Sequence, residues 1–286
     1  MTEKPGATPP EKAPAPAPAA KAKPAQKKPA TDEPAKAARQ KDRNIIAIAS
    51  GKGGVGKTWF SITLAHALAK NEARTLLFDG DLGLANLDIQ LGLMPKQDLG
   101  GVIAGRLTLN QTVLNHDAYE FDIIAGRSGS GGLVSITTSR LKTLSEDLKV
   151  LAAGYDKVLI DLGAGVEKTV QQLTHTAGQV IVIVTDEPTS LTDAYAFIKV
   201  THTESPGAEI KVVANIVNST REGERTYNTL LKACEGFLKI SPPLLGVVRR
   251  DSKVAEAIRS QTSILTRFPN SEAATDVQKI AQKLLS

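Results

Sequence analysis

The chain carries the octapeptide Gly51-Lys52-Gly53-Gly54-Val55-Gly56-Lys57-Thr58 between an apolar run at residues 45–49 and a helix-like run at residues 59–70. The spacing G-x-x-x-x-G-K-T lets successive backbone N–H groups curl around a phosphate, and the following helix adds the positive end of its dipole. In such a loop Lys57 reaches the outer phosphates and the Thr58 hydroxyl binds Mg²⁺. A plain glycine-rich turn would need only some of these residues, so the complete match predicts a triphosphate-binding loop between a strand and a helix.

Acidic residues follow two further apolar runs. The run at 155–160 ends in Asp161 and leads into glycines, and the run at 74–78 leads into Asp79 and Asp81. The carboxyl ends of parallel strands meet at one edge of the sheet, so these carboxylates are expected beside the phosphate loop. Aspartates in glycine-rich segments are often turn formers, but downstream of a phosphate loop Asp161 is expected to hold Mg²⁺ through water.

The rest of the chain alternates between strand-like and helix-like segments. Residues 179–184 form a continuous apolar run, as in a strand that is buried on both faces of a parallel sheet. Further strands are predicted at 121–126, 210–215 and 244–248. This alternation predicts an α/β fold for residues 45–286, with a doubly wound, mostly parallel sheet and helices on both of its faces.

Two regions are less clearly predicted: one consists of short pieces, and the other allows two interpretations. Short amphipathic pieces are expected at 99–104 and 107–114, with Thr108 as a helix cap. The apolar stripe at 271–285 predicts either the last helix covering the sheet or a lipid-binding amphipathic helix. The stripe is short and has no bulky aromatic residue, which favours the first interpretation.

The first 44 residues have a different composition from the rest. They hold nine of the 15 prolines and ten Lys or Arg against five Asp or Glu, whereas the remaining 242 residues hold 25 of each charge. Such a segment is expected to be disordered, as a tether, a partner-binding arm, an electrostatic anchor or a solubilising tail. The net charge of +5 therefore lies in the tail, which argues against a strongly basic nucleic-acid-binding face on the domain.

Cysteine content and hydropathy exclude other classes. Cys234 is the single cysteine of the sequence, so neither an intramolecular disulfide nor a thiolate metal cluster within one chain can form. No apolar run approaches the ~20 residues that span a bilayer, and the N-terminus lacks the apolar core of a signal peptide. A soluble, cytoplasmic protein is expected.

Lys52 lies inside the loop at a position that the plain motif leaves free. The run K-G-G-x-G-K-T resembles the deviant Walker A loop of the MinD/ParA class of P-loop ATPases, in which this lysine crosses a dimer interface to the partner's phosphates. The resemblance implies an ATP-dependent homodimer that hydrolyses ATP slowly to ADP and phosphate, with Mg²⁺ as cofactor and stimulation by partners. It also implies that Asp81 orients the attacking water, that Asp79 supports the Mg²⁺ shell and that Asn215 contacts adenine. The implied nucleotide-binding residues are Gly51, Lys52, Gly53, Gly54, Val55, Gly56, Lys57, Thr58, Trp59 and Asn215, with Lys52, Lys57 and Asp81 catalytic and Thr58, Asp79 and Asp161 around the metal.

Two other motifs narrow the resemblance. Asp161-Leu162-Gly163-Ala164-Gly165 and the segment 186–195 are most similar to flagellar number regulators of the FlhG/FleN kind. That likeness implies control of polar flagella through a flagellar SRP-type GTPase, switch-complex proteins or a flagellar transcription activator, at a cytoplasmic, polar or transiently membrane-associated location. The chain departs from the pattern in lacking a D-Q-A-type motif at 36–40, in Trp59 at a position usually small and polar, and in a missing proline at 248–251.

Two alternatives come from the same superfamily. A ParA-type ATPase that segregates DNA or positions other cargo would need basic residues on the folded surface, which the neutral domain charge disfavours. A redox or iron–sulfur protein would need paired cysteines, which Cys234 alone does not supply.

Overall fold

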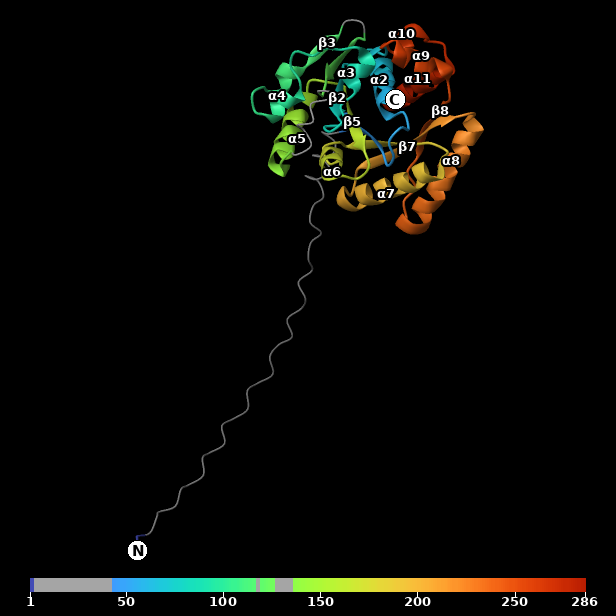
Figure 1. The fold of residues 1–286 in the computed structure, drawn as a ribbon. Coiled ribbons are helices and arrows are strands. Elements are labelled where there is room, and N and C mark those ends of the chain that lie inside the picture. Colours follow the sequence, from blue (N-terminus) through green and yellow to red (C-terminus); the bar gives the residue numbers. More distant parts are fainter. Residues whose placement is uncertain (3–42, 117–118, 127–135) are drawn as a thin grey trace.

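The computed structural model describes residues 1–2, 43–116, 119–126 and 136–286 (Figure 1). Nearly all of the predicted tail at 1–44 lies outside these ranges. The strands are β1 (Ile45–Ser50), β2 (Thr75–Gly80), β3 (Leu114–His116), β4 (Phe121–Ile124), β5 (Lys157–Ala164), β6 (Gln179–Val184), β7 (Glu209–Val217) and β8 (Leu244–Arg249).

Within the described ranges these eight strands form one sheet in the order β3-β4-β2-β5-β1-β6-β7-β8. All neighbouring pairs are parallel except β3 with β4, which is antiparallel at the edge. All six residues of β1 are buried, because helices cover both faces of the sheet. The predicted doubly wound, mostly parallel sheet is confirmed.

The helices form one layer on each face (Figure 1). Ile46 and Ile48 of β1 point into one core, while Ile45, Ala47 and Ala49 point into the other, as the alternation of a strand requires. The first core is covered by α2 (Lys57–Ala69), α3 (Leu87–Leu91), α9 (Ser252–Arg259), α10 (Ile264–Arg267) and α11 (Glu272–Leu285). The second is covered by α4 (Leu99–Ile103), α5 (Thr138–Ala152), α6 (Lys168–Thr174), α7 (Pro188–Glu204) and α8 (Thr220–Ala233).

The helix α2 lies at the centre of its layer. Every one of its residues is buried, because the sheet lies beneath it and α11 packs alongside. A helix that is surrounded in this way needs no charged face, which explains why the run after Thr58 is mostly apolar and holds only Ser61, Thr63 and His66 as polar residues. The phosphate loop is therefore anchored to the most enclosed of the helices in the described ranges.

The C-terminal segment covers the sheet, in agreement with the favoured prediction. Val277, Ile280 and Ala281 of α11 are buried against α2 and β8. Arg249 at the end of β8 fixes this helix by donating from Nε to Asp276 Oδ2 at 2.8 Å and from Nη2 to Asp276 Oδ1 at 2.9 Å. None of the helices in the described ranges combines the length and hydropathy that crossing a bilayer would require.

The prediction of one amphipathic piece at 107–114 was wrong. The segment divides into the 3₁₀ turn η1 (Leu109–Thr112) and the start of the edge strand β3. Thr108 is the N-cap residue of η1, as predicted, and it forms a capping box with Gln111, whose Oε1 accepts a hydrogen bond from the Thr108 backbone N–H at 2.8 Å. A second irregular turn, the π-helical η2 (Cys234–Leu238), follows α8; Cys234 is buried there, and burial raises the pKa of its thiol to about 11.

Candidate functional site: a phosphate loop with two levels of carboxylates

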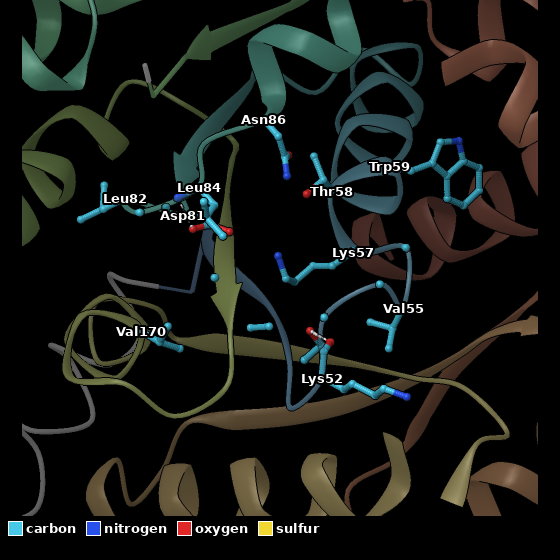
Figure 2. A pocket seen from close by; sticks show the side chains of 18 of the residues that line it. Lys52, Val55, Lys57, Thr58, Trp59, Asp81, Leu82, Leu84, Asn86 and Val170 are labelled. Atoms are coloured by element: carbon cyan, nitrogen blue, oxygen red, sulfur yellow. Dashed lines mark hydrogen bonds between the residues drawn. The ribbon is translucent and has the colours of Figure 1, made fainter. Parts of the chain in front are cut away.

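The phosphate loop joins β1 to α2 at the carboxyl edge of the sheet. The next strand in the chain, β2, lies beyond β5 on one side of β1, whereas β6 lies on the other side. The strand order thus reverses around β1, and open α/β sheets bind ligands in the crevice at such a point. A cavity of about 670 Å³ opens there, lined by loop residues and by segments that follow β2 and β5 (Figure 2).

Backbone geometry shows why the loop needs glycine. Gly56 has φ 83°, in the left-handed region, and a Cβ there would lie 2.7 Å from Asn215 Nδ2. At Gly51 a Cβ would lie 2.1 Å from the backbone carbon of Asp193 in α7. The loop therefore lies directly against α7 and Asn215, with no room for a side chain at Gly51 or Gly56.

Lys57 and Thr58 converge on Asp161 at the end of β5. Lys57 Nζ lies 3.3 Å from Asp161 Oδ1, and Thr58 Oγ1 donates to Asp161 Oδ2 at 2.7 Å. The Asp161 side chain is 1% exposed, so its charge depends on these partners rather than on water. Figure 2 shows Lys57 and Thr58 on the side of the loop that faces Asp81 and Asn86.

Ser61, a residue that the sequence did not single out, also contacts Asp161. Its Oγ lies 2.9 Å from Asp161 Oδ1 and 3.0 Å from the carbonyl oxygen of Lys57. The only signal in the sequence is the spacing, because residues three and four positions apart lie on one face of a helix. This spacing places Ser61 on the helix face of Lys57 and Thr58 but does not say which strand that face meets, so the pattern alone does not predict the contact.

Asp79 lies beside Asp161 at a deeper level. The two residues are paired in the register of β2 and β5, and Asp79 is 1% exposed. Its carboxylate accepts hydrogen bonds from the backbone N–H groups of Asp81 at 3.2 Å and Leu87 at 3.4 Å. Burial, and secondarily the charge of Asp161, raises the pKa of Asp79 to about 8. Asp79 therefore supports the loop after β2 from below and does not line the cavity.

Asp81 lines the cavity itself. Its Oδ1 accepts a hydrogen bond from the backbone N–H of Leu84 at 3.0 Å, which holds the carboxylate within its own loop. A Cβ at Gly163 would lie 3.4 Å from the same oxygen, so Asp81 faces the backbone that follows Asp161. Of Asp79, Asp81 and Asp161, Asp81 is thus the carboxylate that lines the cavity.

Lys52 lies at the rim of this cavity, and its side chain extends away from Lys57 and Thr58, as Figure 2 shows. Its Nζ pairs with the carboxylate of Glu187 and contacts Thr189 Oγ1 at 3.0 Å. Both partners belong to the N-terminal end of α7, and we call the three residues the Lys52 latch. The side chain of Lys52 is 37% exposed, so it lies at the surface and is accessible to a second molecule.

Asn215 and Trp59, the two residues in question for contact with the adenine base, have different surroundings. Asn215 is 2% exposed and donates from Nδ2 to the carbonyl oxygen of Val55 at 2.7 Å, so it supports the phosphate loop from beneath. Trp59 lines the cavity from the first turn of α2, and its Nε1 is buried without a hydrogen-bond partner. Contacts of either residue with adenine stay a prediction.

The oxygen ligands of the site suit Mg²⁺ that arrives with a nucleotide. Among the described residues no group of three His, Cys, Asp or Glu side chains could hold a metal by itself. Thr58 Oγ1 and Asp161 nevertheless present hard oxygen atoms beside the loop. Mg²⁺ typically takes one or two such ligands and completes its shell with phosphate oxygens and water.

Comparisons with known proteins agree with this geometry. Residues 46–264 match the family described as the CobQ/CobB/MinD/ParA nucleotide binding domain. The chain is 36% identical over 240 residues to the antiactivator FleN of Pseudomonas aeruginosa, across 84% of this chain and 85% of that protein. It is 30% identical over 243 residues to the flagellum site-determining protein YlxH of Helicobacter pylori, across 85% and 82%. The septum site-determining protein MinD of Pyrococcus horikoshii, solved with Mg-ADP, superposes with a TM-score of 0.73 at 26% identity, across 84% of this chain and 95% of that one.

The predicted resemblance to the MinD/ParA class, and within it to FleN and its relatives, is confirmed by these matches. The match at 46–264 takes in the phosphate loop, the carboxylates after β2 and β5, and the strands on both sides of β1. The chain belongs to the CobQ/CobB/MinD/ParA nucleotide-binding family, as an ATP-binding, MinD-like P-loop ATPase.

Proposed function

We propose that this protein is an ATP-dependent, dimerising regulatory ATPase that controls the number or placement of polar flagella. The observation that carries the proposal is the likeness to FleN and YlxH over more than four fifths of the chain, one named as an antiactivator and the other as a flagellum site-determining protein. The exposed position of Lys52 at the rim of the site supports the dimer.

In this proposal each polar residue of the site has a separate task. Lys57 and the backbone N–H groups of the loop bind the outer phosphates, and Thr58 and Asp161 hold the metal shell. When bound, Mg²⁺ would neutralise charge on the β- and γ-phosphate oxygens. Asp81 accepts a hydrogen bond from the attacking water and aligns it with the γ-phosphorus. Asp79 keeps the loop of Asp81 in place through its two backbone hydrogen bonds.

Lys52 supplies the part of the site that one chain lacks. To reach phosphate it must leave Glu187 and Thr189 and extend into the cavity of a second copy. A lysine beside the phosphates of the partner subunit would stabilise the negative charge that develops on the leaving oxygen. Dimerisation and hydrolysis are coupled in this scheme, because each subunit completes the other's site and separates once phosphate is lost.

The partners we propose are a flagellar SRP-type GTPase, flagellar switch-complex proteins and a flagellar transcription activator. The activator has the most direct support, since the FleN relative is named for opposing one. We propose a cytoplasmic protein that is polar or transiently at the membrane. The apolar face of α11 is buried against the sheet, so membrane contact would need another segment or a partner.

The proposal is tested by deleting the gene in its host and counting flagella per cell by electron microscopy. Extra or misplaced flagella are expected, with rescue by the wild-type gene and without rescue by Asp81→Ala. Normal flagella in the deletion strain, together with plasmid loss or misplaced division, would contradict the flagellar role and assign the ATPase to another cargo.

A DNA-segregating ATPase of the ParA type makes a different prediction. It would bind DNA with ATP, in a salt-dependent manner, after removal of the basic residues at 1–44. The domain carries 25 positive and 25 negative residues, so we expect no such binding in a filter or mobility-shift assay.

A further inference from the structure

Asp161 receives three polar contacts from a single turn of α2. Lys57 Nζ lies 3.3 Å and Ser61 Oγ 2.9 Å from its Oδ1, while Thr58 Oγ1 donates to Oδ2 at 2.7 Å. The carboxylate is almost fully buried, and a charge in that position needs donors at all times.

In the proposed function Asp161 gives up two of these three contacts when nucleotide binds. In the proposed function Lys57 turns to the outer phosphates and Thr58 becomes a metal ligand. Both side chains line the cavity and can make that change. Oδ1 then loses its lysine and Oδ2 loses its hydroxyl, at the moment when the carboxylate must point at the metal shell.

Ser61 is the donor that stays. It is fully buried, lies one turn deeper in α2 than Lys57, and is absent from the lining of the cavity. No phosphate or metal can reach it without moving the helix. Its hydroxyl has one proton and two acceptors nearby, the carbonyl of Lys57 and the Asp161 carboxylate, and the charged acceptor gives the stronger bond.

From this geometry we infer that Ser61 is a positioning residue for the metal shell. It would hold Oδ1 of Asp161 while Lys57 and Thr58 are released to Mg-nucleotide, so that Oδ2 stays on the side of Thr58, where the metal shell would form. The inference rests on the proposed nucleotide site, and it adds a residue outside the phosphate-loop motif. Partners of this kind orient metal-binding groups, and their loss costs about 10- to 100-fold in metal affinity.

The consequence is a selective one. Removing the Ser61 hydroxyl should leave nucleotide affinity without Mg²⁺ unchanged, because the loop and Lys57 bind the phosphates directly. The gain in affinity that Mg²⁺ provides should fall by about tenfold, because Asp161 is then free to rotate. A residue with a merely structural role would change both affinities together.

Thr63 provides a matched control in the same helix. It is fully buried, and its Oγ1 donates to the carbonyl of Trp59 at 2.8 Å, so it has a backbone bond like that of Ser61 but no carboxylate partner. Thr63→Val removes that hydroxyl with little change in volume. Ser61→Thr, in contrast, keeps a hydroxyl donor at position 61.

The test measures ADP affinity by isothermal titration calorimetry, in Mg²⁺ and in EDTA, for the wild type, Ser61→Ala, Ser61→Thr and Thr63→Val. The ratio of the dissociation constant in EDTA to the one in Mg²⁺ measures the gain in affinity that Mg²⁺ provides. We expect this ratio to fall about tenfold in Ser61→Ala alone, with the dissociation constant in EDTA unchanged. An unaltered ratio in Ser61→Ala, or an equal fall in Thr63→Val, would overturn the inference. If the alanine variant does not fold, Ser61→Cys gives the same comparison, because the thiol is only a weak donor.

The same data separate this inference from the proposed function. Absence of ADP binding by the wild type, with or without Mg²⁺, would contradict the nucleotide site on which the function rests. Normal binding with a Mg²⁺ effect that does not depend on Ser61 would remove only the role of Ser61.

Discussion

At the scale of single residues, the buried carboxylate of Asp161 explains how the phosphate loop and its helix are held to the sheet. It is the point where Lys57, Thr58 and Ser61 meet, so the strand β5 and the helix α2 are joined by charge as well as by apolar packing. Removing Lys57 takes away a partner of this carboxylate, whereas removing Asp81 takes away a carboxylate that lines the cavity and the hydrogen bond that it accepts from the Leu84 N–H.

Lys57→Ala is expected to weaken Mg-ADP binding by roughly 10- to 100-fold, the range for losing charge-assisted hydrogen bonds to phosphate. Calorimetric titration measures this effect, and circular dichroism verifies that the variant is folded. Retention of wild-type affinity in a folded variant would contradict the phosphate-binding role of Lys57.

His66 predicts a pH effect on stability. It is 3% exposed, and its Nδ1 lies 2.8 Å from Ser263 Oγ. Burial, and then the charge of Lys70, lowers the pKa of His66 to about 4, from 6.5 in the unfolded chain, while Glu120 opposes the shift. As the pH falls, the unfolded state binds the proton before the folded state does. The contribution of His66 to the free energy of unfolding is therefore fully present above pH 6.5 and is lost as the pH falls toward 4.

Between pH 7.5 and 5 this difference amounts to about 2 kcal/mol of unfolding free energy. Asp79 titrates in the opposite direction in the same range, because its raised pKa favours the folded state as the pH falls. Urea unfolding at both pH values therefore has to be compared between the wild type and His66→Gln. The difference between their two pH-dependent changes in unfolding free energy is the contribution of His66. Identical pH dependence in the two proteins would show that His66 does not stay neutral in the fold.

At the scale of elements, the N-terminal end of α7 holds the side chain of Lys52 through Glu187 and Thr189. The latch joins this helix to the phosphate loop, and Gly51 lies against the backbone of the same helix. A movement of the loop that frees Lys52 therefore also changes the contact with α7, so a partner bound to α7 is in a position to influence dimerisation.

Glu187→Gln is expected to strengthen the ATP-dependent dimer, because two latches must open for each dimer that forms. An exposed ion pair contributes about 0.2–1 kcal/mol, so the dissociation constant should fall by about 2- to 30-fold. Sedimentation equilibrium with the ATP-bound Asp81→Ala background gives the constant, with Asp186→Asn as the neighbouring charge control. A dimer that is unchanged or weaker in Glu187→Gln would contradict the latch.

The sequence predicted these elements unevenly. The phosphate loop, the carboxylates after β2 and β5, and the parallel sheet depend on local patterns and could be predicted. The strand β3 has only three residues and no alternation, and it exists because β4 offers an unpaired edge. The contacts of Ser61, Glu187 and Asn215 span 100, 135 and 160 positions of the chain, so only the folded structure shows them.

At the scale of the whole molecule, one chain holds an almost complete site. Lys57, Thr58 and Asp81 line one cavity, with Asp161 buried behind Lys57 and Thr58, while Lys52 at the rim pairs with Glu187. In the proposed function a single copy binds nucleotide, and Lys52 of a second copy adds the last positive charge. Because residues 45–286 carry equal numbers of positive and negative side chains, association of two copies would depend on specific contacts and not on long-range electrostatic attraction.

Asp81→Ala is expected to bind ATP normally and to remain dimeric after the wild type has returned to monomer. The substitution removes the water-orienting carboxylate and leaves the phosphate contacts in place, so hydrolysis should slow by about 100-fold or more, within the range for general-base catalysis. Light scattering coupled to gel filtration at successive times after ATP addition measures the effect. Dissociation of the variant at the wild-type rate would argue that another residue orients the water.

The place of Trp59 has a practical consequence. It is the single tryptophan of the sequence, 6% exposed, in the first turn of the helix that follows the phosphate loop, and it lines the nucleotide cavity. Indole emission depends on nearby charge and on polarity, and a triphosphate with its metal brings both within a few side chains of the ring. Intrinsic fluorescence, excited at the red edge to avoid the four tyrosines, should therefore follow nucleotide entry, hydrolysis and release in real time without any label.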